Sequence, residues 1–238
     1  MKALIFNSGI GKRMGEMTTK QPKCMSEIGK GFTIISWQLE LLEKYKIKDV
    51  IITTGPFSEL LEKYVLSLHK NLNITFVHNP EYDKTNYIYS MHCAKKYLDD
   101  DFLILHGDLV MEPSVIEDLI ASEKSVVCVD KLLSLPQKDF KAKIKDGLVS
   151  KIGIEFFGED CVACQPAYLF LKKDFIIWLK EVESFCEKGE KNVYAENAFN
   201  EKSHLMNIYT MELHSRLCNE IDNLEDLSII SHTFLKKC

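Results

Sequence analysis

Residues 2–15, KALIFNSGIGKRMG, join a short apolar run to a glycine-rich turn. The run Lys2–Asn7 has the length and composition of a buried strand, and Gly9 and Gly11 follow its carboxyl end directly. In α/β proteins, glycines at this point let backbone N–H groups approach a ligand beyond the carboxyl ends of the strands. The segment therefore predicts an α/β sheet with a binding loop after its first strand.

Four further runs repeat the pattern of this first strand. They are apolar and rich in β-branched residues, and segments with the helical spacing of apolar residues lie between them; the runs are Asp49–Thr54, Asn73–His78, Phe102–Gly107 and Ser125–Asp130. Strands that alternate with helices in this way indicate βαβ units, in which parallel strands are buried on both faces. We therefore predict an α/β fold with a doubly wound, mostly parallel, Rossmann-like sheet and helices on both of its faces.

The pattern changes after Asp130. Two short runs, Phe140–Lys145 and Val149–Gly153, flank Asp146-Gly147, a dipeptide typical of tight hairpin turns. Further elements are predicted as the strands Cys164–Leu171, Met206–Leu213 and Arg216–Ile221, the helix Lys173–Cys186, and a last helix with Asp222 as its N-cap. We interpret this half as a small β-rich insertion within a single domain, residues 1–238.

Composition and charge exclude several classes of protein. The 238 residues carry a net charge of −5, which argues against non-specific nucleic-acid binding, because such binding requires a basic footprint. No stretch approaches the roughly 20 apolar residues that span a bilayer, and the first apolar run is too short for a signal peptide. We expect a cytoplasmic protein that binds neither nucleic acid nor membranes.

Eight cysteines are scattered along the chain. Cys161 and Cys164 form the one CxxC pair, and no second pair or nearby histidine completes the four ligands of a structural zinc site. Buried cysteines in apolar surroundings behave as small hydrophobic residues. We therefore expect reduced thiols in the core and no zinc.

The loop after the first strand contains two cations that suit a polyphosphate. Arg13 follows the glycines and Lys23 follows Pro22; arginine offers a planar fork to phosphate oxygens and lysine a point charge. A Walker A loop would have serine or threonine at Arg13, and a dinucleotide fingerprint would have glycine at Met14. These residues alone leave two interpretations open, a triphosphate-binding loop and a solvated basic loop.

Several motifs, in one order, resemble those of the sugar-phosphate and phosphocholine nucleotidyltransferase superfamily. Gly9-x-Gly11-x-Arg13-Met14 followed by Pro22-Lys23 is similar to its G-x-G-x-R … P-K signature. Other similar stretches follow in register: Asn79–Tyr82, Asn86–Ser90, the strand-like run that ends in Asp108, and Glu220-Ile221-Asp222. The chain as a whole resembles the bacterial phosphocholine and aminoethylphosphonate-type cytidylyltransferases.

The resemblance implies an enzyme that transfers CMP from CTP to a small phosphorylated or phosphonate acceptor, releases pyrophosphate, and feeds surface-polysaccharide or lipid decoration. Residues 1–130 would form the nucleotide-binding half and residues 131–238 the acceptor-binding half. By the same resemblance, Arg13, Lys23 and Asp108 are catalytic, and Asp108, Asp222 and Glu220 hold Mg²⁺. The implied nucleotide contacts are Asn7, Ser8, Gly9, Gly11, Lys12, Gly55, Asn86 and Ser90.

The acceptor side departs from the family pattern. Tyr194-Ala195-Glu196-Asn197 resembles a Y-W-D-N stretch that helps to enclose choline, with Ala195 in place of the tryptophan. Because quaternary ammonium groups favour aromatic cages, the change shifts the prediction from phosphocholine towards aminoethylphosphonate, phosphoethanolamine or phosphoglutamine. Tyr194, Glu196 and Lys141 are the predicted acceptor contacts.

Two other functions stay open at this point. One is a sugar-1-phosphate nucleotidyltransferase that uses UTP, dTTP or GTP, and the other is a catalytically inactive, nucleotide-binding regulatory module. Asp108 taken alone is also compatible with a turn or N-cap role, and we predict that His78, His92 and His106 are structural. The pattern is compatible with a monomer or a homodimer.

Overall fold

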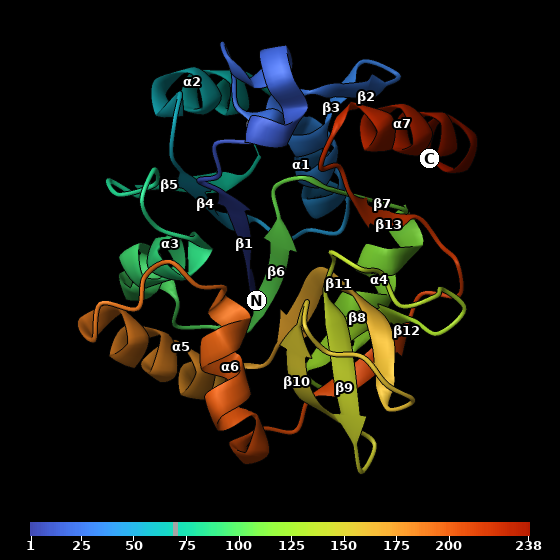
Figure 1. Cartoon of the computed structure of the whole chain (residues 1–238). Coiled ribbons are helices and arrows are strands. Elements are labelled where there is room, and N and C mark those ends of the chain that lie inside the picture. Colours follow the sequence, from blue (N-terminus) through green and yellow to red (C-terminus); the bar gives the residue numbers. More distant parts are fainter. Residues whose placement is uncertain (69–70) are drawn as a thin grey trace.

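The computed structural model describes residues 1–68 and 71–238 and builds them around a central mixed β-sheet (Figure 1). β1 (Lys2–Asn7) lies in the middle of this sheet. It pairs in parallel with β4 (Asp49–Thr54) on one side and with β6 (Phe102–His106) on the other. β5 (Asn73–His78) continues the sheet beyond β4, again in parallel.

The order of these strands creates a crevice at one end of the sheet. The chain passes from β1 through β4 to β5 in one direction, and β6 then returns to the other side of β1. The connections after β1 and β6 therefore leave in opposite directions along the sheet, and ligands bind at such a switch point. The predicted doubly wound, mostly parallel sheet is confirmed.

β11 (Cys161–Phe170) extends the sheet beyond β6 in antiparallel pairing. The strands that accompany it are β8 (Val126–Asp130), β9 (Lys141–Lys145), β10 (Leu148–Gly153) and β12 (Tyr209–Glu212). β9 and β10 form the predicted hairpin, and its turn residues Asp146 and Gly147 have φ angles of 53° and 78°, as a type I′ turn requires. The predicted strands of the second half are thus confirmed, with small shifts at their ends.

Alternation along β1 gives each face of the sheet its own core. Ala3 and Ile5 belong to one buried cluster, and Leu4 and Phe6 belong to the other. The first face is covered by α1 (Ile34–Lys44), α2 (Ser58–Leu68), α4 (Pro113–Ala121), α7 (Leu224–Lys237) and the small ribbon β2 (Glu27–Gly29) and β3 (Phe32–Thr33). The second face is covered by α3 (Tyr87–Ala94), α5 (Lys172–Glu187) and α6 (Ala195–Lys202) (Figure 1).

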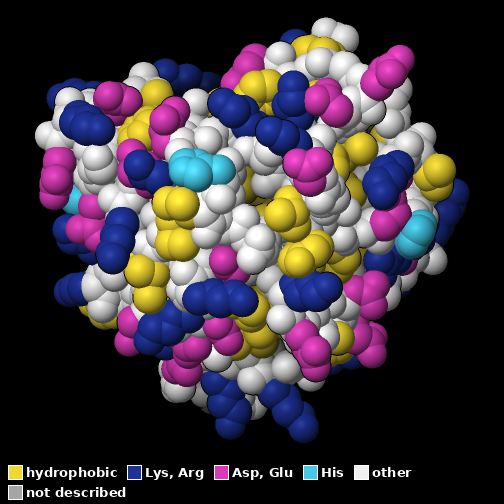
Figure 2. Space-filling view, turned by 90° about the horizontal axis from the view of Figure 1, so that it is seen from below, with side chains coloured by type: hydrophobic (Ala, Val, Ile, Leu, Met, Phe, Trp, Pro, Cys, Tyr) yellow, Lys and Arg dark blue, Asp and Glu magenta, His cyan; other side chains and the backbone are white. Residues whose placement is uncertain are grey.

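Most of the cysteines that the sequence assigns to the core are buried, six of the eight. The two tryptophans, Trp37 and Trp178, lie in one cluster each. Within residues 1–68 and 71–238, the helices fall short of the length and apolarity that a bilayer crossing demands. On the face at the lower end of Figure 1, basic and acidic side chains are interspersed (Figure 2), which differs from the basic stripe of a nucleic-acid-binding face.

A two-stranded ribbon joins the middle of the chain to its C-terminal part. β7 (Leu109–Met111) follows β6 closely, and β13 (Cys218–Glu220) pairs with it in antiparallel register. Beyond the last pair, the N–H of Ile221 donates to the carbonyl of Asp108 at 2.9 Å. The sequence predicted β13 but not its partner strand. This ribbon brings the residues that follow β13 beside Asp108.

The N-cap predicted for the last helix is wrong by one residue. Asn223, not Asp222, caps α7, and its Oδ1 accepts the N–H groups of Glu225 and Asp226 at 2.8 and 3.0 Å. Asp226 accepts the Asn223 N–H at 3.2 Å in return, which completes a capping box. Because Asn-x-x-Asp closes this box one residue later than Asp-x-x-Glu would, the Asp222 carboxylate is left to line the crevice.

Gly55 supports the glycine-rich loop from the end of β4. A Cβ atom at this position would lie 2.3 Å from the carbonyl oxygen of Ser8 and 3.0 Å from its Cα. These are backbone atoms, so a larger residue cannot be accommodated by a side-chain rotation. Close packing of two backbone segments therefore requires glycine here.

We predict that Gly55→Ala lowers the free energy of unfolding by about 1–3 kcal/mol, because overpacking a tight contact costs that much. Gly9→Ala is the matched control in the adjoining loop, since nothing lies within 4 Å of a Cβ there and its φ is not positive. Urea unfolding followed by circular dichroism measures both variants. Equal stability of the two would contradict the packing argument.

Candidate active site

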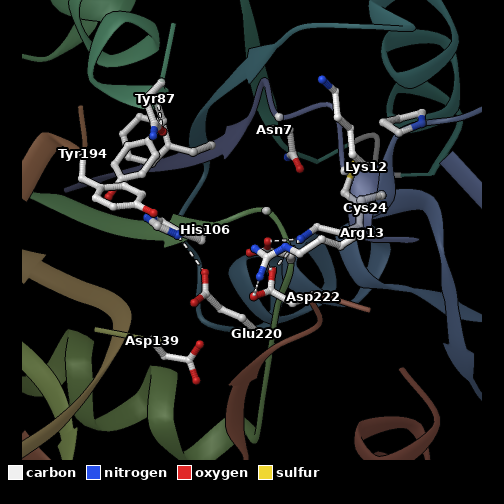
Figure 3. A pocket seen from close by; sticks show the side chains of 18 of the residues that line it. Asn7, Lys12, Arg13, Cys24, Tyr87, His106, Asp139, Tyr194, Glu220 and Asp222 are labelled. Carbon is white, nitrogen blue, oxygen red and sulfur yellow. Dashed lines mark hydrogen bonds and ion pairs between the residues drawn. The ribbon is translucent and has the colours of Figure 1, made fainter. Parts of the chain in front are cut away.

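A cleft of about 370 Å³ opens at the crevice between β1 and β6. Its walls come from the loop after β1, the residues after β6 and β13, and the segment before β9 (Figure 3). The predicted site residues that line it are Asn7, Gly9, Gly11, Lys12, Arg13, Lys23, Asn86, Asp108, Tyr194, Glu220 and Asp222. Ser8 and Ser90 line an adjoining cavity of about 140 Å³, whereas Gly55, Lys141 and Glu196 line neither space.

Local backbone chemistry shapes the glycine-rich loop. Gly11 adopts a left-handed φ of 69°, and a Cβ there would approach the side chain of Lys23 to 3.2 Å. Two short 3₁₀ helices follow, Lys12–Thr18 and Lys23–Met25. They carry Arg13 and Lys23 to the same carboxylate, that of Asp222.

Two cations and two carboxylates meet in the cleft. The Lys23 ammonium forms a short ion pair with Asp108 and lies 3.3 Å from Oδ1 of Asp222. The Arg13 guanidinium binds both carboxylate oxygens of Asp222, at 2.7 and 2.8 Å (Figure 3). The structure therefore brings together residues that the sequence predicted as catalytic and as metal ligands.

These contacts set the charges of the group. Burial lowers the pKa of Lys23, but the charge of Asp108 and its hydrogen bond, with help from Asp222 and Glu220, outweigh burial and raise this pKa. Burial raises the pKa of the Asp108 carboxyl, but the charges of Lys23 and His106 outweigh it, so this pKa is lowered overall. At neutral pH, an ammonium therefore faces a carboxylate in the cleft.

Glu220 and His106 form a second pair beside this group. Nδ1 of His106 lies 2.9 Å from Oε1 of Glu220 (Figure 3). Burial and the nearby charge of Asp108 raise the pKa of Glu220 to about 7, against the hydrogen bond and charge of His106. Burial lowers the pKa of His106, yet the hydrogen bond and charge of Glu220 raise it overall. The sequence predicted a structural histidine, and the structure places His106 in the cleft wall.

The cleft offers oxygen donors that suit a divalent metal. Oδ1 of Asp108 is buried and has no hydrogen-bond partner in the part of the chain that the structure describes. Ligand atoms of His106, Asp108 and Glu220 lie within 4.8 Å of one another, and Asp222 shares the Lys23 ammonium with Asp108. Carboxylate oxygens are the ligands that hard cations prefer. The residues present therefore fit a metal such as Mg²⁺.

The small adjoining cavity is lined by polar groups. Ser8 Oγ donates to Oγ1 of Thr53 at 2.9 Å, and Ser90 Oγ accepts from the amide of Asn79 at 3.0 Å. Asn86 is the N-cap of α3 and lines both this cavity and the cleft. The structure thus collects these predicted nucleotide contacts at one place, and their roles stay predictions.

The predicted acceptor contacts are separated in the structure. Tyr194 faces the cleft, with its ring centre 5.8 Å from that of Tyr87 and 5.1 Å from that of Phe140 (Figure 3). Glu196 is 1% exposed and accepts hydrogen bonds from the hydroxyls of Tyr87 and Tyr168. Its carboxylate therefore holds the aromatic wall from behind.

Lys141 also lies behind the cleft wall. It is fully buried, and its ammonium donates to the carbonyls of Pro136 and Ile154 at 2.8 and 2.5 Å. Its pKa is lowered by burial. These contacts anchor the loop before β9, which carries Asp139 to the cleft. Direct contact of Lys141 or Glu196 with an acceptor stays a prediction.

The cleft is also lined by residues that were not predicted as site residues, and Tyr87, His106, Lys138 and Asp139 are among them. Lys138 and Asp139 lie in an irregular loop, where no periodicity indicates the direction of a side chain. His106 carried a usable signal, because it stands two residues before Asp108 at the end of a buried strand and strand side chains alternate.

Comparison with known proteins identifies the family. Residues 3–141 match the MobA-like NTP transferase domain, which is more than half of the chain. The chain belongs to this family. The transferase is therefore a nucleotidyltransferase, as its sequence predicted. Arg13, Lys23 and Asp108 lie within the matched residues, and Asp222 and Glu220 lie beyond them.

Relatives match the transferase over almost its full length. It is 27% identical to the CTP:phosphoglutamine cytidylyltransferase of Campylobacter jejuni, over 96% of this chain and 98% of that protein. It is 25% identical to the choline-phosphate cytidylyltransferase of Streptococcus pneumoniae, over 95% of each. The inositol-1-phosphate CTP transferase of T. maritima has the same fold, with a TM-score of 0.81 and 21% identity over 99% of this chain and 95% of that one.

We predict that the transferase without metal loses stability as the pH rises from about 5 to about 8. Folded Glu220 and His106 have raised pKa values, so the folded state binds more protons than the unfolded chain in this window. Glu220→Gln should reduce the pH dependence of the unfolding free energy by on the order of 1–3 kcal/mol, since one pKa unit corresponds to about 1.4 kcal/mol. Urea unfolding in EDTA at a series of pH values measures this free energy. Glu59→Gln is the control, because Glu59 is exposed on α2. If the unfolding free energies of wild type and Glu220→Gln change equally with pH, protonation of the Glu220–His106 pair does not stabilise the fold.

Proposed function

We propose that this protein transfers CMP from CTP to a small phosphorylated or phosphonate acceptor and releases pyrophosphate. One observation carries the proposal: at the switch point of the sheet, Lys23 contacts both Asp108 and Asp222, and Arg13 contacts Asp222. Cations suit phosphate oxygens and carboxylates suit a metal, so a metal-bound triphosphate fits this one place. Relatives named as CTP-dependent cytidylyltransferases support the choice of nucleotide.

We place the base in the small cavity lined by Ser8, Asn86 and Ser90. Its volume of about 140 Å³ is sufficient for one base, and its hydroxyl and amide groups can hydrogen-bond the edge of that base. The preference for CTP over the other nucleotides rests on the relatives.

In the proposed reaction, an oxygen of the acceptor's phosphate or phosphonate attacks the α-phosphorus of CTP. A bond forms between this oxygen and phosphorus, the bond to the β-phosphate breaks, and pyrophosphate leaves with the electron pair. The attacking oxygen is already ionised near neutral pH, so the cleft has to position and neutralise charge rather than remove a proton. In this proposal, Lys23 would stabilise the α-phosphate, and the more exposed Arg13 would stabilise the leaving pyrophosphate.

Asp108, Asp222 and Glu220 would hold Mg²⁺ through their carboxylate oxygens. The ion would supply neutralisation of phosphate charge during in-line displacement. Phosphate oxygens of the bound nucleotide would compete with Asp108 and Asp222 for the cations Lys23 and Arg13. In this proposal, nucleotide binding frees the two carboxylates to coordinate.

We place this reaction in the cytoplasm, because free cysteines persist in reducing compartments. The CMP-linked product would carry an activated head group. Such a product suits later transfer to a surface polysaccharide or a lipid.

Pyrophosphate release across a substrate panel tests the proposed function. We expect turnover with CTP, Mg²⁺ and at least one of phosphocholine, phosphoethanolamine, aminoethylphosphonate and phosphoglutamine. With UTP, dTTP or GTP, kcat/KM should be at least about tenfold lower, because the hydrogen bonds to the base are lost. Exclusive turnover of a sugar 1-phosphate would favour the alternative enzyme class. No turnover with any pair would favour the inactive nucleotide-binding module.

Asp108→Asn should lower kcat at least about a hundredfold and weaken Mn²⁺ binding measured by electron paramagnetic resonance, since the amide removes a charged ligand. Asp146→Asn is the matched control, because asparagine suits the positive φ of that hairpin turn. Thermal melts verify that both variants fold. Wild-type turnover by Asp108→Asn would remove this carboxylate from the metal site.

A further inference from the structure

A second cavity, of about 300 Å³, lies between β11, β13 and α7 and adjoins the cleft. Asp139, Glu220 and Asp222 line both spaces, so the two share one acidic wall. Neither Tyr194 nor any of the predicted nucleotide contacts lines this second space. We call this second space the α7 pocket.

Gln165 identifies the α7 pocket as a place for a polar ligand. Its side chain is 8% exposed and lines the pocket, and its amide has no hydrogen-bond partner within residues 1–68 and 71–238. The pairing of β11 with β8 shifts register between Cys164 and Tyr168, which re-aims side chains in this stretch. The amide in the pocket wall is therefore available to a ligand, to which it can donate and from which it can accept hydrogen bonds.

Carboxylates supply the charge that the α7 pocket offers a ligand. The shared wall is acidic, and Asp226 adds a further carboxylate to the pocket. Arg216 and Lys237 line the pocket but not the cleft, and they are paired with Asp118 and Glu112 at 2.7 and 2.9 Å. An ammonium group is therefore favoured beside the carboxylates, and an amide or carboxylate group of the ligand can hydrogen-bond the amide of Gln165.

The lining of the α7 pocket also separates two classes of ammonium. Its described residues include no aromatic side chain, so a trimethylammonium group would lack the cation–π surface that it favours. A primary ammonium has N–H donors instead, and the carboxylates of Asp139 and Asp226 can accept them.

We propose that the α7 pocket receives the end of the acceptor that carries no phosphate and selects an amino-acid-like group there. A primary ammonium lies toward Asp139 and Asp226, and an amide or carboxylate lies toward Gln165. This inference rests on the proposed function, because it requires the acceptor's phosphate to lie at Asp222 in the adjoining cleft. The acceptor then spans both spaces across their shared wall.

Steady-state kinetics of Gln165→Leu test the proposal, with CTP and with phosphoglutamine, O-phosphoserine and phosphocholine as acceptors. We expect wild type to prefer one of the two amino-acid phosphates over phosphocholine by at least about tenfold in kcat/KM. In Gln165→Leu, the KM for that acceptor should rise about tenfold while the KM for CTP stays unchanged, because a buried hydrogen bond to the acceptor alone is lost.

Gln137→Leu is the matched control, since Gln137 is exposed in the loop before β9 and lines neither space. Its KM values should equal those of wild type. Asp139→Asn is the second variant, because Asp139 is exposed and its substitution leaves the core intact. It should also raise the acceptor KM and leave the CTP KM unchanged.

Two results would overturn the assignment of the α7 pocket while leaving CMP transfer in place. One is an unchanged acceptor KM in the folded variants, and the other is a preference for phosphocholine over both amino-acid phosphates. Absence of pyrophosphate release from CTP with every acceptor would instead overturn the proposed function, and this inference with it.

Discussion

The cleft depends on the Lys23 ammonium, which lies between carboxylates from the middle and the end of the chain. A buried charge is costly without a partner, and here Lys23, Asp108 and Asp222 each remove that cost for another. Arg13 adds a second cation from the solvent side. The glycine-rich loop, the end of β6 and the start of α7 are thus held together by the same groups that phosphates and a metal would bind. In the proposed function, ligand binding and loop position would therefore be coupled.

Backbone pairing makes this arrangement possible. β7 and β13 form a ribbon, and the bond from the Ile221 N–H to the Asp108 carbonyl extends it by one more step. The capping box of Asn223 and Asp226 then begins α7 immediately beyond Asp222. The Asp222 carboxylate is consequently held between β13 and the N-terminus of α7. A position on regular elements defines a side chain more closely than a position on a loop.

The acidic wall of Asp139, Glu220 and Asp222 separates two environments that could distinguish acceptors. On one side, Tyr194 belongs to an aromatic wall that Glu196 supports through a tyrosine hydroxyl. On the other side, the α7 pocket offers carboxylates and an amide. Aromatic rings favour a quaternary ammonium, whereas carboxylates and amides favour groups that donate hydrogen bonds. In the proposed function, acceptor preference would thus depend on the direction in which the acceptor extends from the carboxylates of Asp108 and Asp222.

The longer strands, the hairpin turn at Asp146-Gly147 and the glycine-rich loop with its two cations were predictable from the sequence, because local periodicity and turn chemistry encode them. The short strands β2, β3 and β7 were not predicted. The motifs were also sufficient to predict the family. Contacts between distant residues emerge from the folded chain: Asp222 meets Lys23, His106 lies in the cleft, and Glu196 turns towards tyrosines behind the wall. The physical reason is that these contacts follow from the pairing of distant strands and from irregular loops. A local pattern carries no information about either.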